Sequence, residues 1–597
     1  MSYFTFLNKR DKNGLLLRYK ALNDLNQISD NALSLVKKYK VYNLLTKEFD
    51  QNFINNYYRK ILGEELYSLS AQSTINYWHY ENEGKFLTKE ILVESTLPVI
   101  LINQAWNEKK FNFRINLLKK FFGIFKNKLI YFYYHYKSYK KKIKKAIPTT
   151  PTIAINYIEG HDQKKRNDLF WLKDSKLNRS TLLIYFQNKR SMFRYTNYSK
   201  LKKDLNKLSV KYLKLWKESL SDYSKDFDKI NSSLKNLNPK DDIEQWLLND
   251  AKILISKIQY WYSFFKDFNV KIHINAEERG TSNIIKQLAL DKLESLSIGK
   301  LRSFPRNLKD DWLGFYPNNA FFVWGNETSA RMKKSGNCFN NLIISGYPYP
   351  DNSENNDLKF LSELKMKFNE QGVKFIIMLL DGSHGDNNDY YFQGILTNDL
   401  IKYYEIFFKW LKNEKDLGII IKSKKYENLI QNKKMKKIIE DSNQTKRLFI
   451  SDSFNFEPKN YSSIIDFSVS IACDLPTSGL QMAVYGARSI IYDYPNLKKI
   501  EDKMYQWGNK KVIFDNLEEI ILSLKKFKKD PDINKGLGDW SKNIDDIDAF
   551  MDKKGYIRIG DYLLNLQIAF NLKYKGKEAL KFANNEYSKK WGEDKII

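Results

Sequence analysis

The stretch that decides the fold reads Cys473-Asp-Leu-Pro-Thr-Ser-Gly-Leu-Gln-Met-Ala-Val-Tyr-Gly-Ala-Arg-Ser-Ile-Ile-Tyr-Asp493. A short apolar run precedes it, and the turn Thr477-Ser-Gly479 opens an apolar stretch at helical spacing. A second apolar run, Ser489-Ile-Ile-Tyr-Asp493, follows soon after Gly486. Strand, hydroxyl-rich turn, helix, glycine stop and strand together predict a βαβ unit. Because helix N-termini attract anions, this turn is either an anion site or simply a capped helix start.

Length and composition limit the function classes. A chain of 597 residues predicts more than one domain, because single cores rarely grow past about 250–300 residues. The net charge of +30 favours anionic partners such as nucleotide phosphates, lipid head groups or acidic glycans, although an AT-rich genome explains part of the lysine excess. No common nucleic-acid-binding signature occurs, so nucleic acid is not the expected partner. Two distant cysteines, Cys338 and Cys473, favour a reducing cytoplasm over a disulfide framework or a metal cluster.

Residues 1–147 are predicted to be mostly helical, with the apolar run Pro98-Val-Ile-Leu-Ile102 as a candidate strand. An aromatic-rich stretch, Phe121 to Tyr136, leads into the lysine cluster Lys137 to Lys145. Lys126 and Lys128 interrupt the aromatic stretch, which disfavours a membrane span. Residues 121–145 are therefore either a helix lying on an anionic membrane surface or a buried helix with a solvated basic end. We expect a cytoplasmic protein that contacts the inner face of the cytoplasmic membrane peripherally.

The predominantly helical pattern ends at Pro148-Thr-Thr-Pro151, which is predicted to be a linker or the start of a domain. The strand expected over 152–157 ends in a loop that carries Glu159, His161 and Asp162. Such groups at a strand's carboxyl end could supply a general base or could simply form a solvated turn. Further strands are expected over 181–186, 270–274, 319–325 and 342–345, around a helical insertion at 199–265. The strand ending at 274 carries a second polar cluster that begins with Asn275.

The second half, 351–597, repeats this alternation. Strands are expected over 373–380, 417–423, 448–450, 467–472, 489–493 and 512–514, and a glycine-containing loop, Asp381 to Asp389, follows the first of them. Alternating strands and helices predict an α/β protein with two Rossmann-like domains facing a cleft, residues 148–350 and 351–597. The helices after residue 515 are assigned to the second domain.

Several segments resemble those of two-domain GT-B glycosyltransferases, in particular the bacterial proteins that build O-antigens and capsules. In the first half these segments are Tyr157-Ile-Glu-Gly-His-Asp162, Lys165-Arg-Asn-Asp-Leu-Phe-Trp171, Phe321-Phe-Val-Trp-Gly325 and Ile344-Ser-Gly-Tyr-Pro348. In the second half they are Ile420-Ile-Lys-Ser-Lys424 and the stretch quoted at the outset, ending at Asp493. The resemblance covers about 150–515 and rests on the order and spacing of these segments. It implies that the second domain binds a nucleotide-sugar and the first binds the acceptor.

The resemblance also implies a donor site made by residues at the strand ends of the second domain. The donor phosphates would lie on the hydroxyl turn at the helix start, Lys422 would neutralise their charge, and residues of the loop at 381–389 would line the site. The full set is Ser383, Gly385, Lys422, Thr477, Ser478, Gly479 and Gln481. Gln481 stands near a position where this fold often has a glutamate, and an amide there can bond a ribose or base without acting as a carboxylate.

For an inverting transfer, Glu159 or Asp162 is the expected base, His161 is a third candidate, and Asp168 supports their loop. The resemblance implies no essential metal and no cofactor beyond the nucleotide-sugar substrate, because the helix dipole and basic groups stabilise the leaving phosphate. The expected acceptor is a lipid-linked glycan or a surface polysaccharide. A Kdo-type or polyol-phosphate transferase on the same scaffold, a non-catalytic polyanion-binding protein and an inactive scaffold remain alternatives.

Overall fold

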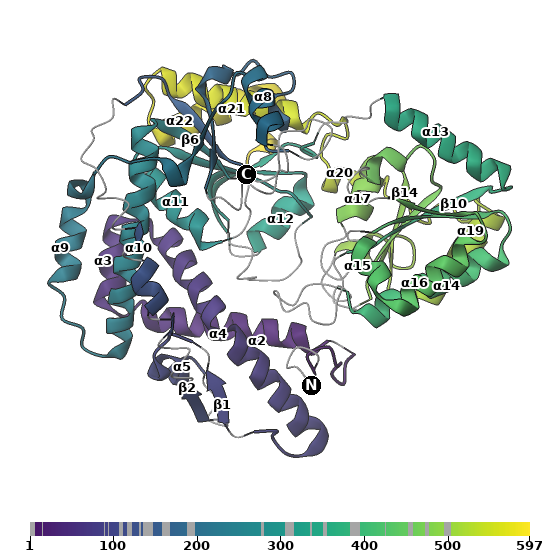
Figure 1. Cartoon of the computed structure of the whole chain (residues 1–597), viewed down its shortest axis with the longest axis horizontal. Helices are drawn as coiled ribbons and strands as arrows, with labels where there is room; N and C mark the ends of the chain where they lie inside the picture. The colour runs from purple at the N-terminus through teal and green to yellow at the C-terminus, as the bar shows by residue number, and fades with distance from the viewer. Residues whose placement is uncertain are drawn as a thin grey trace.

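Two parallel sheets and a helical N-terminal region make up the fold (Figure 1). The computed structural model describes residues 6–14, 16–88, 90–93, 95–106, 112–115, 122–123, 125–130, 133–134, 147–157, 167–187, 198–275, 280–304, 316–334, 337–349, 355–382, 395–423, 426–451, 458–471, 477–494 and 503–597.

The first sheet has seven parallel strands in the order β5-β4-β3-β6-β7-β8-β9. Chain order therefore runs outward from β3 to one edge and then outward from β6 to the other, which is the Rossmann arrangement with one added strand. The strands are β3 (Thr152–Asn156), β4 (Leu182–Phe186), β5 (Lys211–Lys214), β6 (Val270–Asn275), β7 (Leu296–Lys300), β8 (Pro317–Val323) and β9 (Cys338–Ile344).

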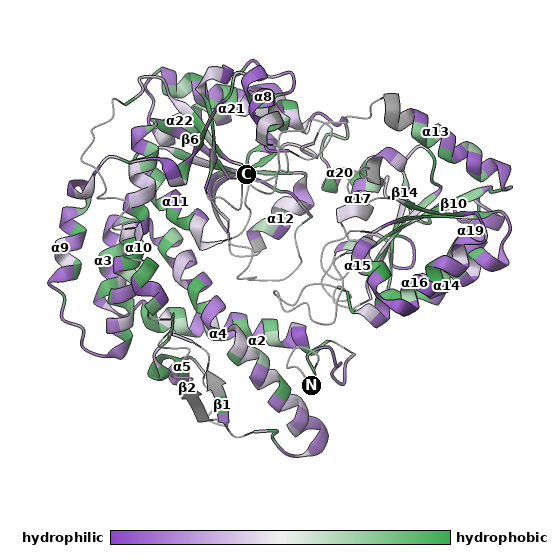
Figure 2. Ribbon diagram, in the orientation of Figure 1, coloured by the Kyte–Doolittle hydropathy of each residue, from purple (hydrophilic) through white to green (hydrophobic). Residues whose placement is uncertain are grey.

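The second sheet has six parallel strands in the order β12-β11-β10-β13-β14-β15, which is again the Rossmann order. Helices cover both faces, so a strand such as Phe375–Leu380 is apolar and buried along its whole length, as the green sheet interior in Figure 2 shows. The strands are β10 (Phe375–Leu380), β11 (Leu417–Lys422), β12 (Leu448–Ser451), β13 (Phe467–Ile471), β14 (Arg488–Tyr492) and β15 (Ile513–Phe514). The helices are α13 (Asn355–Glu370), α14 (Thr397–Asn413), α15 (Tyr426–Gln431), α16 (Lys433–Asn443), α17 (Thr477–Val484), α18 (Lys503–Gly508) and α19 (Leu517–Lys529). The predicted α/β class with two Rossmann-like domains is confirmed.

The N-terminal region is mostly helical, as expected, and it shares one apolar core with a face of the first sheet. The expected strand at 98–102 is wrong, because α5 (Val99–Ala105) occupies that run. A short apolar run fits either structure by pattern alone, and here it packs as a helix against α2, where the Asn31 amide donates to the Ala105 carbonyl at 3.0 Å. The remaining elements are α2 (Leu17–Val36), α3 (Lys40–Glu48), α4 (Gln51–Glu83), β1 (Glu90–Val93), β2 (Asn112–Ile115), α8 (Tyr198–Lys207), α9 (Asp228–Lys235), α10 (Asp242–Asp267) and α11 (Thr281–Asp291).

The C-terminal helices α21 (Gly555–Asn571) and α22 (Gly576–Trp591) pack on the first sheet, so their assignment to the second domain is wrong. Arg558 explains the attachment. Its side chain is 1% exposed, Nε donates to the Ser345 carbonyl at 2.7 Å, and its two terminal nitrogens bind Asp552 at 2.9 and 2.5 Å. The Tyr587 hydroxyl also donates to the Ile344 carbonyl at 2.7 Å. The bonds to the Ser345 and Ile344 carbonyls join residues more than 200 positions apart, which local sequence patterns do not encode.

Two sets of contacts join the halves. Helix α17 lies between them, because Leu480, Ala483 and Val484 belong to the core of the first half while the helix follows β13 of the second. Helix α20 (Ile544–Ile547) lies beside it, and α12 (Asn326–Lys334) packs on α20. The N-terminal segment also reaches the second half, where Leu16 and Tyr19 join its core.

Candidate functional site

The strand order of each sheet reverses at one point, between β3 and β6 in the first and between β10 and β13 in the second. In open parallel sheets, ligands bind outside the carboxyl ends of the strands at this switch point. The carboxyl edges of the two sheets meet in this fold. Phe304, which follows β7, bonds Thr477, which follows β13, and Tyr347, which follows β9, bonds Gln481. The candidate site is therefore the region where the carboxyl edges of the two sheets meet.

Two buried asparagines, Asn156 and Asn275, form the switch point of the first sheet. They are the last residues of the neighbouring strands β3 and β6 and are 3% and 4% exposed. Side chains alternate along a strand, so Asn156 shares a face with Ala154 and Asn275 shares one with His273, and both of these belong to the side that α10 covers. Neither amide oxygen has a hydrogen-bond partner within the described part of the chain.

Buried amide oxygens are normally bonded, so these two atoms are candidates for binding a ligand. The sequence patterns place Asn275 in a strand-end cluster but single out neither residue for the site. A usable signal exists, because both strands finish in asparagine after three residues of Ile, Val or Ala at adjacent or alternate positions, Thr152-Ile-Ala-Ile-Asn156 and Val270-Lys-Ile-His-Ile-Asn275.

A buried cation, Lys300, ends β7 on the same edge. Its side chain donates to the Tyr349 hydroxyl at 2.5 Å and lies 4.6 Å from the centre of that ring and 5.1 Å from the ring of Phe170. Ring faces attract cations most strongly where water is excluded, which offsets part of the cost of burying this charge. The sequence patterns do not single out Lys300 for the site. The geometry adds a fixed positive charge to the first sheet's edge.

The start of α17 is packed tightly on the second sheet, as expected for the βαβ unit. A Cβ atom at Gly479 would lie 2.5 Å from the Ser470 hydroxyl of β13 and 3.0 Å from the Ser489 hydroxyl of β14. Glycine therefore lets the helix approach the strands closely, and the first turn of α17 is held at the carboxyl edge.

The side chains of Thr477 and Gln481 contact the first half directly. The Thr477 hydroxyl accepts a hydrogen bond from the Phe304 amide at 3.0 Å, and the Gln481 amide donates to the Tyr347 hydroxyl at 2.8 Å. Both side chains are buried, whereas Ser478 between them is partly exposed. The donor role predicted for these residues stays a prediction, and Ser478 is the hydroxyl of this turn that is best placed for it.

Lys422 and Asp381 lie side by side at the second sheet's edge. Lys422 ends β11 opposite Leu380 of β10, and Asp381 is the next residue after that strand. The Tyr404 hydroxyl donates to the Asp381 carboxylate at 2.8 Å, and burial together with that negative charge raises the pKa of Tyr404 well above 10. Tyr404 is therefore a neutral donor that holds Asp381 in place.

The remaining predicted site residues fall outside the described residues. Glu159, His161 and Asp162 belong to the undescribed segment 158–166, and Ser383 and Gly385 belong to 383–394. Their roles stay predictions. Asp168, the expected support of the first loop, is described and is 3% exposed, and its backbone carbonyl accepts a hydrogen bond from the Trp171 indole at 3.1 Å.

Comparison with known proteins yields structural similarity only. No family model matches the chain, and no curated protein matches it. Among solved structures, it is similar to MnaA of S. aureus with UDP, at 11% identity and TM-score 0.40, over 71% of this chain and 97% of that one. It is similar to the wall teichoic acid polymerase TagF at 12% identity and TM-score 0.40, over 76% and 97%. It is also similar to HepE of Anabaena with UDP and glucose at 9% identity and TM-score 0.37, over 71% and 99%. Identities and scores this low assign neither a family nor an activity.

Proposed function

We propose that this protein is a glycosyltransferase that moves a sugar from a nucleotide-sugar to a growing surface polysaccharide or lipid-linked glycan. The observation that carries the proposal is the contact between the carboxyl edges of the two sheets, seen in the hydrogen bond between Thr477 and the Phe304 amide. One Rossmann-type edge would bind the nucleotide and the other the acceptor, so that the sugar and the attacking hydroxyl come together between them.

The second sheet is the donor side in this proposal. The first turn of α17 offers backbone amides and the Ser478 hydroxyl, and Lys422 ends a strand on the same edge. Amides at a helix start and a nearby ammonium stabilise negative charge as it develops on a departing phosphate. These groups would stabilise the leaving nucleotide, and the proposed reaction uses no metal ion.

The first sheet is the acceptor side. The segment that carries Glu159, His161 and Asp162 begins just after β3, and β3 ends in Asn156 at the switch point. A carboxylate or imidazole from this segment would accept the proton of the acceptor hydroxyl. The amide oxygens of Asn156 and Asn275 would accept hydrogen bonds from other hydroxyls of the same sugar.

A thermal-shift screen against CMP-, UDP-, GDP- and ADP-linked sugars tests the proposal. We expect one nucleotide class to raise the unfolding temperature, because a ligand that binds only the folded state stabilises it. The same ligand should give a smaller shift with the Lys422→Ala variant. A flat response to every nucleotide-sugar would contradict the proposed function.

We also propose peripheral contact with an anionic membrane through residues 121–145, of which 122–123, 125–130 and 133–134 are among the described residues and the lysine cluster 137–145 is not. Within this segment 122–123 and 125–130 are helical, and Phe122, Phe125 and Leu129 are 66%, 53% and 54% exposed at three- and four-residue spacing, with Lys126 and Lys128 nearby. Such a face suits a leaflet surface. Among the described helices, none is long and apolar enough to span a bilayer.

Co-sedimentation with vesicles of anionic lipid tests the membrane contact. The change Phe125→Ser should reduce binding to these vesicles. Leu522→Ser is the matched control, because Leu522 is equally exposed on α19 at 54%. Equal losses from both variants, or from neither, would contradict the membrane contact.

A further inference from the structure

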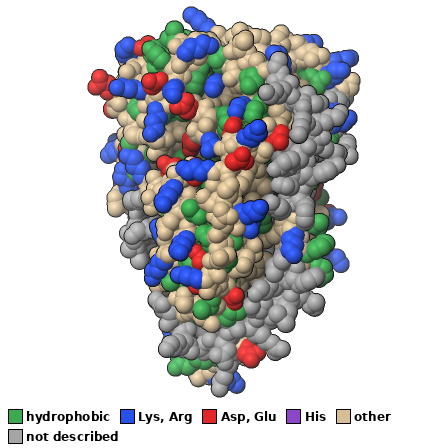
Figure 3. Space-filling view, turned by 90° about the vertical axis from the view of Figure 1, so that its left-hand side faces the viewer, with side chains coloured by type: hydrophobic (Ala, Val, Ile, Leu, Met, Phe, Trp, Pro, Cys, Tyr) green, Lys and Arg blue, Asp and Glu red, His purple; other side chains and the backbone are tan. Residues whose placement is uncertain are grey.

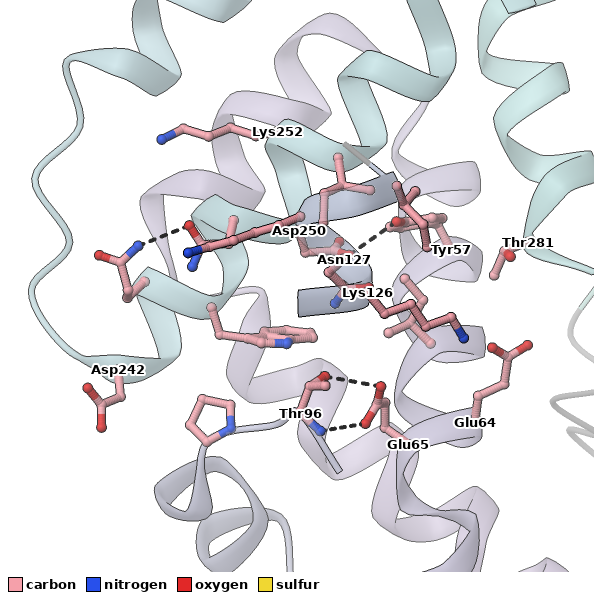
Figure 4. Close-up of a pocket in the computed structure, with 18 of the residues that line it drawn as sticks. Tyr57, Glu64, Glu65, Thr96, Lys126, Asn127, Asp242, Asp250, Lys252 and Thr281 are labelled. Atoms are coloured by element: carbon pink, nitrogen blue, oxygen red, sulfur yellow. Dashed lines mark hydrogen bonds between the residues drawn. The ribbon is translucent and has the colours of Figure 1, made fainter. Parts of the chain in front are cut away.

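A large pocket lies in the helical region. It has a volume of about 970 Å³, and α4, α10, the residues around Pro98 and residues 126–130 form its walls (Figure 4). Pockets that bind small molecules measure about 300–1,000 Å³, so this one has room for a ligand at the upper end of that range. None of the residues predicted for the donor or acceptor sites lines it.

The charges on the pocket wall are balanced. Its described lining residues include four carboxylates and four lysines, namely Glu64, Glu65, Asp242, Asp250, Lys126, Lys128, Lys252 and Lys257. The whole chain carries a net charge of +30, and Lys and Arg side chains are widespread on the face shown in Figure 3. A pocket for a phosphate or another polyanion would have an excess of lysine or arginine. The balance therefore favours an uncharged polar ligand.

Amide and aromatic side chains complete the lining. The amides are Asn103, Asn127, Gln245 and Asn249, and the aromatic residues are Tyr57 and Trp246. An amide both donates and accepts hydrogen bonds, which matches a sugar hydroxyl that also does both. An indole presents a wide apolar face beside a polar edge, and this matches the apolar face and polar rim of a sugar ring.

Two of the carboxylates differ in how they are held. Glu65 accepts hydrogen bonds from the Thr96 amide at 2.7 Å and from the Ser95 and Thr96 hydroxyls at 2.7 and 3.1 Å, so it fixes the wall near Pro98. Asp250 receives one hydrogen bond, from the Tyr57 hydroxyl at 3.3 Å. Its second oxygen has no partner within the described part of the chain, and burial raises the pKa of Asp250 to about 6.

We propose that this pocket binds an uncharged stretch of glycan and thereby holds the acceptor chain at a distance from the transfer site. The inference rests on the proposed function for the identity of that chain as an acceptor. The pocket wall includes Thr281, the first residue of α11, which is the helix that follows β6 and Asn275. A glycan in the pocket would therefore lie beside the element that leads from the acceptor edge of the first sheet.

Saturation-transfer NMR with the full chain and short neutral oligosaccharides of glucose, galactose and N-acetylglucosamine tests the inference. We expect at least one oligosaccharide to bind, and to bind about tenfold more weakly to the double variant Gln245→Ala, Asn249→Ala, because two hydrogen bonds are lost. Both side chains are exposed on α10, so the fold should tolerate the change. The matched control is Asn231→Ala, Asn236→Ala, at exposed positions in and just after α9 and outside the pocket.

The outcomes separate this inference from the proposed function. If no neutral oligosaccharide binds, or if the wild type and the pocket variant bind equally well, the proposed glycan site would be overturned. Tighter binding of acidic than of neutral oligosaccharides would overturn it as well. The thermal shift with nucleotide-sugars should be the same in the pocket variant and the wild type. If no nucleotide-sugar gives a shift while the pocket variant loses glycan binding, the proposed transferase fails and the glycan site stands.

Discussion

The two sheets share one strand order but differ in the chemistry at their switch points. At the first switch point, β3 and β6 end in uncharged amides, Asn156 and Asn275. At the second, Asp381 follows β10 and helix α17 follows β13, while Lys422 ends the neighbouring strand β11. Amides suit sugar hydroxyls, and a helix start with an ammonium suits phosphate. The comparison teaches that topology marks where each half would bind a ligand, while the residue types at that place indicate which ligand it would be.

The two halves also differ in which parts of the chain cover their sheets. The first sheet is covered by elements from both ends of the chain, the N-terminal helices on one face and α21 and α22 on the other. The second is covered mainly by the helices between its own strands. Stability of the first half should therefore depend on contacts between distant parts of the sequence.

The largest loss of stability is expected when one of these long-range contacts is removed. Arg558→Ala removes a buried guanidinium that bonds Asp552 and the Ser345 carbonyl, and it should lower the free energy of unfolding by about 3–5 kcal/mol. Lys590→Ala is the control, because its ion pair with Asp561 is exposed and contributes at most about 1 kcal/mol. Denaturant unfolding measures both. Equal small losses would show that the C-terminal helices do not support the first sheet.

The second largest loss of stability is expected where α17 packs closely on the second sheet. Gly479→Ala places a Cβ 2.5 Å from the Ser470 hydroxyl and should cost about 1–3 kcal/mol of stability through overpacking. Gly536→Ala serves as the control, because its Cβ would meet only the Lys511 side chain at an ordinary 3.7 Å. Full stability of the Gly479→Ala variant would contradict the tight packing described for this helix.

A third pair of variants sharpens the chemical contrast. We expect Lys422→Ala to weaken binding of the nucleotide-sugar found in the screen about tenfold, through loss of one charge-assisted bond, with the KM for the acceptor unchanged. Asn275→Leu should raise the KM for the acceptor, because a hydrogen-bonding group at the first switch point is lost. It should leave binding of the nucleotide-sugar unchanged. Steady-state kinetics with both substrates varied separates the two effects. If each variant changed the KM for the nucleotide-sugar and the KM for the acceptor equally, the assignment of donor and acceptor sides would be contradicted.

A fourth prediction concerns the dependence of stability on pH. Burial raises the pKa of Asp291 to about 7 from its ordinary 3.8, despite hydrogen bonds from the Gln287 and Asn319 amides. The folded state then holds this proton more tightly than the unfolded chain. The stabilisation is complete below about pH 4 and is lost as the pH rises through 7, at no more than about 1.4 kcal/mol per pH unit.

Asp291→Asn should flatten this slope, as measured by denaturant unfolding across the same pH window. Asp441→Asn, at an exposed position in α16, should keep the wild-type slope. A steep slope that survives in the Asp291→Asn variant would show that another group causes it.

Local patterns predicted most strands and the βαβ unit, because buried parallel strands are continuous apolar runs punctuated by Pro, Gly and hydroxyl residues. They missed β7, and β5 (Lys211–Lys214) lies inside the stretch 199–265 that was predicted to be helical. They failed where contacts between distant residues determine the position of an element. The position of α21 depends on Arg558 meeting a carbonyl 213 residues earlier, and the Thr477 hydroxyl meets an amide 173 residues earlier. Asn156 was missed because one polar residue at the end of an apolar strand gains meaning only when the strand order is known.

The central claim is that the second sheet's carboxyl edge binds the nucleotide part of the donor. Hydrogen exchange followed by mass spectrometry, with and without the nucleotide-sugar selected by the screen, tests it most directly. We expect slower exchange in peptides that contain the end of β11 and the first turn of α17, including Lys422 and Ser478, with smaller changes around Asn156 and Asn275. Slower exchange confined to the first sheet's edge, with the second sheet unchanged, would contradict it.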